Sequence, residues 1–405
     1  MSFNIALSGL TAASTDLNIT SNNIANANTT GFKRSRASFA DVYAAGAKSL
    51  NTGAIGDGVR LASTSQQFAQ GNITTTNSNL DLAISGDGFF TLNSPDGYSY
   101  TRNGTFSVDK NGDVVDDTGR ALQVFPPLAI GGFNTGALTN LNLQTSSSAP
   151  NATTLGQVIL NLPASSTPPT IAVFDPNDPQ SYNQSTTTSV YDSLGNRFNA
   201  TFYFIQTATP NQWQVGMTVD GTQVGAPQNL FFSDTGLVTT PVGGDITFPA
   251  FTPPSGAQPL NLTFNFGKST QYGSQFGVNS ITQDGYATGQ LSAVSIDNGG
   301  VVSAVFTNGR STQLGQLAIG NFPNPQGLRQ LGNTSWSEAF ASGNVVLGQA
   351  GTAGFGQIQS GALEQSNVDL TTQLVQLITA QRGFQANAQS ITTENQITQT
   401  IINIR

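Results

Sequence analysis

The acidic residues are the side chains of this sequence with the clearest chemical potential. Asp109, Asn111 and Asp113 are spaced like the first ligands of a calcium-binding loop. An EF-hand also needs flanking helices and a glutamate at its twelfth position, but that position is Arg120 and the flanking residues alternate like strands. The pattern favours a hairpin turn at Asn111-Gly112 and predicts no metal site.

Two carboxylates held together could catalyse acid–base chemistry. A glycosidase holds two carboxyl groups about 5 to 9.5 Å apart in a cleft. Asp116, Asp117, Asp175 and Asp178 are candidates, but all lie in turn-like stretches, where capping and solvation are the usual roles of aspartate. The chain has no histidine and no cysteine, so the commonest general base and the thiolate nucleophile are missing. We find no phosphate-binding glycine loop and expect no catalytic residue, no cofactor and no enzyme activity.

The composition excludes several further classes of protein. The net charge is −8 and there is no basic cluster, which argues against nucleic-acid binding. No apolar run reaches the length of a membrane span, so we expect no membrane insertion. Only 9 % of the 405 residues are charged, against about 25 % usually. The 25 phenylalanines supply material for a core, and the length suggests several domains.

The two ends of the chain have the pattern of long amphipathic helices, over about 2–28 and 367–405. Near the start, apolar residues recur every seven positions, at Phe3, Leu10, Leu17 and Ile24, with Leu7, Ser14 and Ser21 between them. Near the end the repeat is Leu370, Leu377, Phe384 and Ile391, with Leu374, Gln381, Ala388, Asn395 and Ile402 as the offset set. Ser366 to Asp369 is typical of a capping box that opens the second helix. Both seams are typical of a coiled coil.

The outer faces of these helices carry very few charges. Residues 1–32 contain one charged side chain, Asp16. Ordinary coiled coils place Glu and Lys beside the seam. Two interpretations remain open on the residues alone: a helical hairpin packed on its own domain, or a helix pair that also packs against other copies of the chain.

The middle of the chain is β-like. All 18 prolines lie between Pro95 and Pro325. Residues 37–70 look irregular, and alternation then predicts strands near 80–84, 89–90, 100–108, 114–124, 198–205, 213–219, 230–232, 260–266, 291–296, 301–306 and 317–321. The stretch 144–185 is rich in Ser, Thr and Pro, and a domain boundary is expected near its start.

We therefore predict a mostly β fold with long terminal α-helices, paired as a coiled coil, and nested β-rich domains between them. The terminal helical core would contain 1–70 and 361–405. A β-rich middle domain would contain 71–145 and 285–360, with an outer β-rich domain, 146–284, inserted into it.

Two motifs carry a family resemblance. Ser21 to Lys33 (SNNIANANTTGFK) resembles the N-terminal signature of bacterial flagellar rod and hook proteins. Gly361 to Leu370 (GALEQSNVDL), followed by Ala380 to Asn387 (AQRGFQAN), resembles the matching C-terminal signature. The total length and the segments Leu80 to Phe90, Tyr100 to Phe106, Val190 to Asn196 and Gly315 to Pro325 are similar to the hook members of that family.

The resemblance implies a structural subunit that assembles with itself into a curved, flexible helical tube, a universal joint that transmits torque from the motor's rod to the filament. It implies contacts with the distal rod protein, the hook cap protein and the hook–filament junction protein, and passage through the flagellar type III export apparatus. It implies an extracellular location, and the N-terminus indeed lacks the basic segment of a Sec signal peptide. The alternatives are a distal rod protein of the same family and, less well supported, a secreted β-rich adhesin.

On this interpretation the polymer interface consists of the apolar seam residues of both helices. The predicted set is Phe3, Leu7, Leu10, Leu17, Ile24, Leu370, Leu374, Leu377, Phe384, Ile391 and Ile402.

Overall fold

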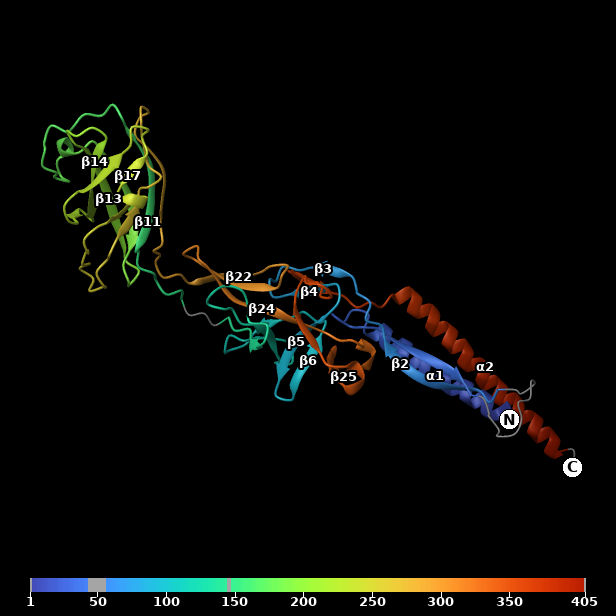
Figure 1. Cartoon of the computed structure of the whole chain (residues 1–405). Coiled ribbons are helices and arrows are strands. Elements are labelled where there is room, and N and C mark those ends of the chain that lie inside the picture. Colours follow the sequence, from blue (N-terminus) through green and yellow to red (C-terminus); the bar gives the residue numbers. More distant parts are fainter. Residues whose placement is uncertain (1, 43–55, 144–146, 404–405) are drawn as a thin grey trace. The chain divides into compact units, whose positions relative to one another are not determined.

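A computed structural model describes residues 2–42, 56–143 and 147–403 of the chain. The chain divides into two compact units, coloured by sequence in Figure 1. Unit 1 contains Met1–Gln144, Ala293–Ala304 and Ser311–Arg405, and unit 2 contains Thr145–Ser292 and Val305–Arg310. The middle of the chain is therefore a separate compact unit. The three-part division expected from the sequence remains a prediction.

The terminal helices of unit 1 form where they were expected, but the first ends three residues earlier and the second begins three residues later. Helix α1 covers Ser2–Ala25 and helix α2 covers Leu370–Asn403. The expected capping box at Ser366 is corrected by the structure: the Asp369 carboxylate accepts a hydrogen bond from the Thr372 backbone N–H (2.7 Å), so Asp369 is the N-cap. Neither helix contains proline, which would interrupt its hydrogen bonds.

The stretch 37–70, expected to be irregular, instead contains most of an antiparallel strand pair. Strand β1 (Ser35–Asp41) pairs with β2 (Val59–Gln66), and residues 43–55 lie outside the described part of the chain. No side chain of either strand is fully buried. Because the ribbon buries neither face, it lacks the apolar alternation by which strands are found in a sequence.

The β-rich part of unit 1 is built mainly on one large sheet. Within the described residues its strand order is β22-β23-β24-β9-β5-β6-β26-β25. Four further strands, β7, β8, β10 and β27, pair beside this path, which gives 12 strands. The strands are β5 (Phe89–Ser94), β6 (Gly97–Thr101), β7 (Ser107–Val108), β8 (Val114–Val115), β9 (Ala121–Phe125), β10 (Thr139–Asn140), β22 (Leu291–Ile296), β23 (Val301–Phe306), β24 (Ser311–Asn321), β25 (Arg329–Gly332), β26 (Ser335–Ser337) and β27 (Val346–Gln349). Short 3₁₀ turns follow at Pro325–Gly327 and Phe340–Ser342.

Two small antiparallel pairs join segments from opposite ends of the chain. Strand β3 (Ile73–Thr75) pairs with β29 (Ala362–Glu364), and β4 (Leu82–Ser85) pairs with β28 (Gln357–Ser360). The predicted strands near 80–84 and 89–90 are confirmed by β4 and β5, and the predicted hairpin at Asn111-Gly112 by the β7–β8 pair.

Two apolar clusters hold unit 1 together. One is mostly aliphatic and includes Leu92, Leu122 and Ile319, which are fully buried. The other is aromatic: Phe89 and Trp336 pack edge to face with ring centroids 5.7 Å apart, and Phe68 contacts both rings. Such aromatic pairs contribute beyond the area that they bury.

Unit 2 is formed by two sheets around one core. In the first, β19 and β20 pair in parallel with the first and last residues of β11, β21 pairs with β11 in antiparallel, and β18 pairs with β19. The second has the order β12-β13-β14-β16-β17, with β15 beside β14. The strands are β11 (Leu155–Pro163), β12 (Gln184–Tyr191), β13 (Arg197–Gln206), β14 (Gln212–Val219), β15 (Thr222–Gln223), β16 (Gln228–Phe232), β17 (Val238–Thr240), β18 (Asp245–Thr247), β19 (Thr263–Asn265), β20 (Thr270–Tyr272) and β21 (Gly277–Gln283). Short 3₁₀ turns occur at Pro179–Ser181 and Val242–Gly244.

The core of unit 2 brings together side chains from both sheets. Phe202 and Trp213 of the second sheet are fully buried in one cluster with Phe264 of the first. The sequence pattern located β13, β14, β16 and β19, but it missed other strands, among them β11, which lies inside the Ser/Thr/Pro-rich stretch. Its buried Val158 and Leu160 are flanked by polar and proline residues, which hide the alternation.

Candidate assembly interface at the chain termini

Helices α1 and α2 pack side by side in antiparallel directions (Figure 1). The Asn23 side-chain amide donates to the side-chain oxygen of Gln373 (3.0 Å). Further along, Gly383 faces Ala13, and Gly9 faces Asn387. The contact between Ala13 and Gly383 lies ten residues before Asn23 in α1 and ten residues after Gln373 in α2. The antiparallel register is therefore continuous between these two contacts.

In each helix, the structure buries residues that lie one position before the second set of seam residues that the sequence predicted. In α1, Ala6 and Thr20 are buried, whereas Leu7 and Ser21 are exposed. In α2, Gln373 and Ala380 are buried, whereas Leu374 and Gln381 are exposed. The second half of each internal seam is thus made of small or amide side chains, not of leucine.

The predicted interface residues fall into two groups. Six are half-buried in the subunit: Leu10, Leu17, Ile24, Leu377, Phe384 and Ile391. Five remain exposed by 42 to 66 %: Phe3, Leu7, Leu370, Leu374 and Ile402. The first group contributes to packing within the subunit, and the second group is accessible to another molecule.

Small residues allow the two helices to approach closely. A Cβ atom on Gly9 would lie 2.7 Å from the side-chain oxygen of Asn387, which is too close without movement. A Cβ atom on Gly383 would lie 4.0 Å from the Cβ of Ala13, an ordinary contact distance. The Asn387 amide itself donates to the Gly383 carbonyl (2.9 Å), which holds its side chain in place.

A buried asparagine connects the helix pair to strand β1. The Asn23 amide donates to the Ser35 carbonyl (2.8 Å), and its oxygen accepts from the Ser35 N–H (2.9 Å). With the bond to Gln373, this side chain joins α1, β1 and α2. In the sequence Asn23 appears only as part of the motif Ser21 to Lys33, and no local pattern reveals its partners.

A buried ion cluster ties both chain ends to the β-rich part of unit 1. The Glu364 carboxylate pairs with Lys33 and with Arg102 (3.2 Å), and the Glu364 and Lys33 side chains are fully buried. The same carboxylate accepts from the Gly71 N–H (2.7 Å), and the Lys33 ammonium also donates to the Ala69 carbonyl (3.0 Å). Sequence reasoning missed this cluster, although Lys33 and Glu364 both lie in or beside the family motifs.

Burial dominates the electrostatics of this cluster. Desolvation lowers the pKa of Lys33 and of Arg102, and the charge of Glu364 opposes the shift in both cases. One carboxylate therefore serves two desolvated cations. A buried carboxylate in such a position holds separate segments together because losing it would leave two buried positive charges.

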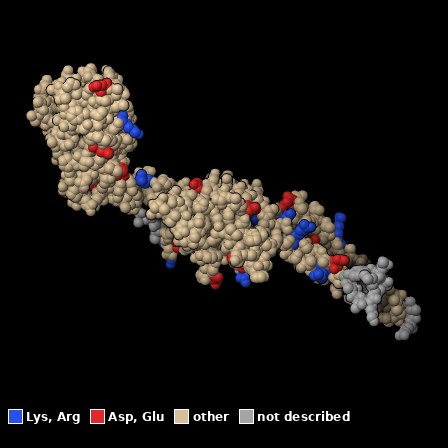
Figure 2. All heavy atoms as spheres, viewed as in Figure 1, with Lys and Arg blue, Asp and Glu red and all other residues tan. Residues whose placement is uncertain are grey.

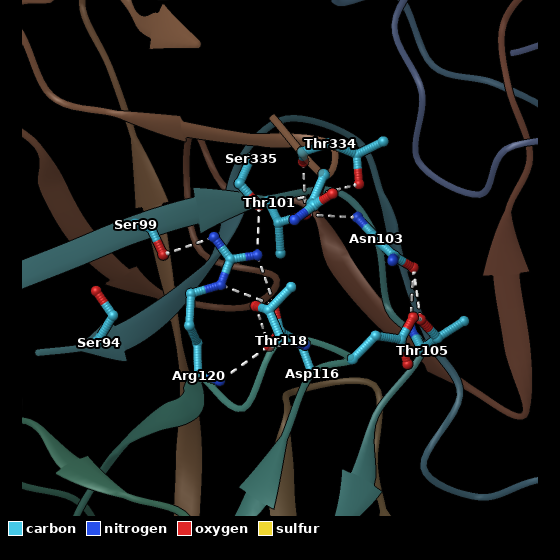
Figure 3. A network of polar contacts seen from close by, with 12 residues as sticks. Ser94, Ser99, Thr101, Asn103, Thr105, Asp116, Thr118, Arg120, Thr334 and Ser335 are labelled. Carbon is cyan, nitrogen blue, oxygen red and sulfur yellow. Dashed lines mark hydrogen bonds and ion pairs between the residues drawn. The ribbon is translucent and has the colours of Figure 1, made fainter. Parts of the chain in front are cut away.

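The aspartates considered for catalysis have structural roles instead. Figure 3 shows Arg120 with two N–H groups on the Asp116 carboxylate (2.9 and 2.6 Å) and a third contact to Ser335 Oγ (2.7 Å). Burial would raise the pKa of Asp116, but hydrogen bonds from Arg120 and Thr118 outweigh it, so the pKa lies below its usual range. Asp116 is an ion-paired turn residue, and its neighbour Asp117 touches Thr105.

The remaining candidate aspartates cap turns. The Asp109 carboxylate accepts from the backbone N–H groups of Asn111 and Asp113 (both 2.8 Å), as in a hairpin turn. Asp178 caps the first 3₁₀ turn through the Gln180 N–H. Within residues 2–42, 56–143 and 147–403 no three metal-ligating side chains come together. In the same ranges no helix has the length and apolarity of a membrane span.

The comparisons with known families follow the domain order of the chain. The family described as "Flagella basal body rod protein" matches residues 3–33, and "Flagellar basal body rod FlgEFG protein C-terminal" matches 359–404. Between them, "Flagellar hook protein FlgE/F/G D1 domain" matches 83–159 and "Flagellar basal body protein FlaE D2 domain" matches 161–286. The helical ends and the β-rich middle of the chain all match families of the flagellar basal body and hook. The chain is therefore an axial protein of the bacterial flagellum.

Relatives that match over their full length show which family of flagellar axial proteins this chain belongs to. The flagellar hook proteins FlgE of Escherichia coli K12 and of Salmonella typhimurium are each 38 % identical to this chain over 100 % of both sequences. That of Rhizobium meliloti is 33 % identical over 98 % of this chain and 97 % of its own. The chain therefore belongs to the flagellar hook protein family, and it is a structural subunit of the flagellar hook.

A solved structure supports the fold. The crystal structure of Helicobacter pylori flagellar hook protein FlgE2 matches 72 % of this chain and 100 % of its own, with a TM-score of 0.52 at 16 % sequence identity. The mostly β architecture is thus shared at a low level of sequence similarity.

Proposed function

We propose that the chain acts in the hook by polymerising through its terminal helices, paired as a coiled coil along the inside of the tube, with the β-rich units outside. The observation that carries this proposal is the exposed apolar set on the helix pair. Leu7 and Leu374 are 45 and 51 % exposed. An open helical polymer needs two different complementary patches on each subunit, and a long helix pair offers them at regular intervals.

The proposed neighbours are first of all other copies of the chain. At the ends of the hook, the distal rod protein, the hook cap protein and the hook–filament junction protein would contact the same termini. We further propose an extracellular location, reached through the flagellar type III export apparatus. Of the two axial roles considered from the sequence, the full-length relatives named as hook proteins support the hook and not the distal rod.

The polar surface suits a tube that bends while it rotates. Figure 2 shows that charged side chains are sparse on the face in view, in keeping with a charged fraction of 9 %. During rotation of a curved tube each subunit passes from the inner to the outer side of the curve. Ser, Thr, Asn and Gln can exchange water-mediated hydrogen bonds, so we propose that contacts between the outer units slide rather than remain fixed.

The proposal is tested by a charge at an exposed seam position. We expect Leu374→Asp to prevent polymerisation, since the polymer would bury an unpaired carboxylate at that position. The subunit itself should fold normally because Leu374 is 51 % exposed in it. Sedimentation and electron microscopy of purified protein measure the result.

The matched control is Thr222→Asp, which introduces the same charge at an exposed position in unit 2. It should leave polymerisation through the termini intact. Tubes of normal length and yield from Leu374→Asp would refute the assignment of this helix face to the interface.

A further inference from the structure

Asparagine is followed by glycine at four places in the chain, and these pairs have a chemistry of their own. The four asparagines are Asn103, Asn111, Asn298 and Asn308. In such a pair the backbone nitrogen of the glycine can attack the side-chain amide carbon of the asparagine, since glycine has no Cβ atom to hinder the approach. The attack requires the peptide between the two residues and the asparagine side chain to move together, so hydrogen bonds on either group oppose it.

The turn between β22 and β23 leaves both reacting groups of Asn298 and Gly299 free. The Gly300 N–H donates to the Asp297 carbonyl (2.9 Å), which makes Asn298 the second residue of the turn and Gly299 the third. Within the described part of the chain the Gly299 N–H forms no hydrogen bond, and the exposed Asn298 side chain has no partner. Of the peptide that must move, only the Asn298 carbonyl is held, by the Ile358 N–H (3.1 Å).

Asn111 occupies a different position in its turn. It is the third residue, so the N–H of the following Gly112 closes the turn by donating to the Asp109 carbonyl (3.1 Å). The Asn111 side-chain amide donates to the Asp109 carboxylate (3.2 Å). The Asn111 carbonyl accepts from the Asn142 side chain (3.1 Å). Both the nucleophile and its target are therefore held.

Asn308 is held in the same way. The Gly309 N–H closes the turn on the Phe306 carbonyl (3.0 Å). The Asn308 side-chain amide donates to the Ala287 carbonyl (2.8 Å), and its oxygen accepts from the Arg310 N–H (3.0 Å).

The fourth pair, Asn103-Gly104, is fixed by packing. The Asn103 side-chain oxygen accepts from the N–H and the hydroxyl of Thr105 (3.1 and 2.9 Å). Gly104 is buried, and a Cβ atom on it would lie 1.6 Å from the Leu82 carbonyl oxygen. This backbone has no space in which to rotate toward the side chain.

We propose that Asn298 is a site of spontaneous deamidation in the folded chain. The Gly299 nitrogen forms a bond to the side-chain amide carbon of Asn298, the bond from that carbon to the side-chain nitrogen breaks, and ammonia leaves. Solvent carries the proton of the Gly299 N–H to the departing nitrogen. Water then opens the cyclic imide without any change of oxidation state. Opening at the side-chain carbonyl gives aspartate, and opening at the main-chain carbonyl gives isoaspartate.

Isoaspartate at this position would disturb the contact of the turn with β28. The main chain would gain a methylene group beside the Asn298 carbonyl, which accepts from the buried Ile358. The neighbouring Gly299 carbonyl accepts from the Gln316 side chain (2.7 Å) and would be displaced with it. The new carboxylate would also stand next to that of Asp297, a second like charge in one turn.

Incubation of full-length, purified subunits in mildly alkaline buffer tests the proposal. Peptide mass spectrometry locates the replacement of NH₂ by OH, and labelling with an isoaspartyl methyltransferase identifies the isoaspartate. We expect Asn298 to react at least about tenfold faster than the other three asparagines. The reason is that its reaction breaks one hydrogen bond, whereas three must break at Asn111 or Asn308. In chain unfolded by urea the four pairs should react at similar rates.

Two variants separate the effect of the turn from that of the dipeptide. Gly299→Ala should slow the reaction several-fold, because the added Cβ hinders the attacking nitrogen. The turn accepts this change, since the φ of Gly299 is not in the left-handed region and the new Cβ would meet only the flexible Asp297 carboxylate (3.3 Å). Asp109→Ala releases the Asn111 side chain, so it should speed the reaction at Asn111 several-fold and leave Asn298 unchanged.

Fluorescence of Trp336 and Trp213, buried in units 1 and 2, verifies that each variant is folded. The proposal is overturned if Asn111 or Asn308 reacts as fast as Asn298 in the folded chain, or if Gly299→Ala loses ammonia at Asn298 at the original rate. Chain aged to high isoaspartate content should unfold in unit 1 at a lower urea concentration than equally aged Gly299→Ala. Equal midpoints would refute the assigned effect on β28.

Discussion

Glu364 is the residue on which the junction between the chain ends and the β-rich part of unit 1 depends. Its carboxylate serves Lys33, Arg102 and the Gly71 N–H from a fully buried position. The two cations come from positions far apart in the sequence, one beside α1 and one after β6. Folding of this junction therefore requires both ends of the chain to be in place.

We predict that Glu364→Gln destabilises unit 1 by about 3 to 5 kcal/mol, because it leaves two buried cations without a counter-charge. Lys33→Met should cost less, since Glu364 would keep Arg102 and Gly71. Urea unfolding followed by Trp336 fluorescence measures the change, while Trp213 reports unit 2, which should not respond. Glu338→Gln, at an exposed position, is the control, and equal effects of the two glutamate variants would contradict the prediction.

Tyr100 makes unit 1 sensitive to alkaline pH. Burial, together with the charges of Glu338 and Tyr98, raises the pKa of this phenol from 10.0 to about 12. The folded state therefore holds the proton in a range where the unfolded state has lost it. This contribution to stability is present below pH 10 and is lost as the pH rises to about 12.

We expect the Tyr100 contribution to amount to about 2 kcal/mol. Tyr100→Phe should flatten the loss of unit 1 stability between pH 10 and about 12, measured by urea unfolding with Trp336 fluorescence. Tyr272→Phe is the control because Tyr272 is 47 % exposed and lies in unit 2. The prediction fails if the two variants lose stability in parallel with the original chain.

The paired terminal helices are the elements through which we propose that the chain assembles. Their internal seam uses Ala6, Ala380 and the two glycines, so it is narrow, and the larger side chains Leu7 and Leu374 are left on the outside. Close approach through small residues thus packs the pair within a subunit and leaves the larger apolar side chains exposed, where the proposed contacts with other copies would use them.

Two glycine substitutions separate packing from helix propensity. Replacing glycine by alanine inside a helix stabilises it by about 0.5 to 1 kcal/mol. Gly383→Ala should show this full gain, because its new Cβ would meet Ala13 at 4.0 Å. Gly9→Ala should show a smaller gain or a loss, because its Cβ would displace the Asn387 side chain.

Thermal melting of the helices, followed by far-UV circular dichroism, measures the difference between these two variants. Since both receive the same propensity gain, only the packing of α1 on α2 can separate them. Identical melting curves would show that the two helices do not pack at this distance in solution.

For the assembled hook, the proposal of sliding contacts makes a prediction about the polymer. High-resolution cryo-electron microscopy of curved tubes should find constant contacts between terminal helices all round the circumference. The contacts between β-rich units should differ between the inner and outer sides of the curve and should be wet, since a dry, closely packed interface resists shear. Dry and identical outer contacts at every position would contradict the proposal.

Much of this architecture is readable in the sequence because it follows from short-range patterns. A seven-residue repeat and the absence of proline predict the two helices, and alternation predicts strands such as β13 and β14, where one face is buried. The turn at Asn111-Gly112 follows from the backbone preferences of these two residues. The motifs at Ser21 to Lys33 and Gly361 to Leu370 were enough to indicate the family.

Other features depend on contacts between residues far apart in the sequence, and no local sequence pattern reveals such contacts. A heptad repeat specifies that a helix has a buried stripe, but the size of the opposing side chains decides whether Leu7 or Ala6, and Leu374 or Gln373, faces inward. The β1–β2 ribbon has no apolar alternation to detect, because its cohesion comes from backbone hydrogen bonds. Lys33, Arg102 and Glu364 look like solvated surface charges in the sequence, and only long-range folding, which removes water from all three together, makes them a buried cluster.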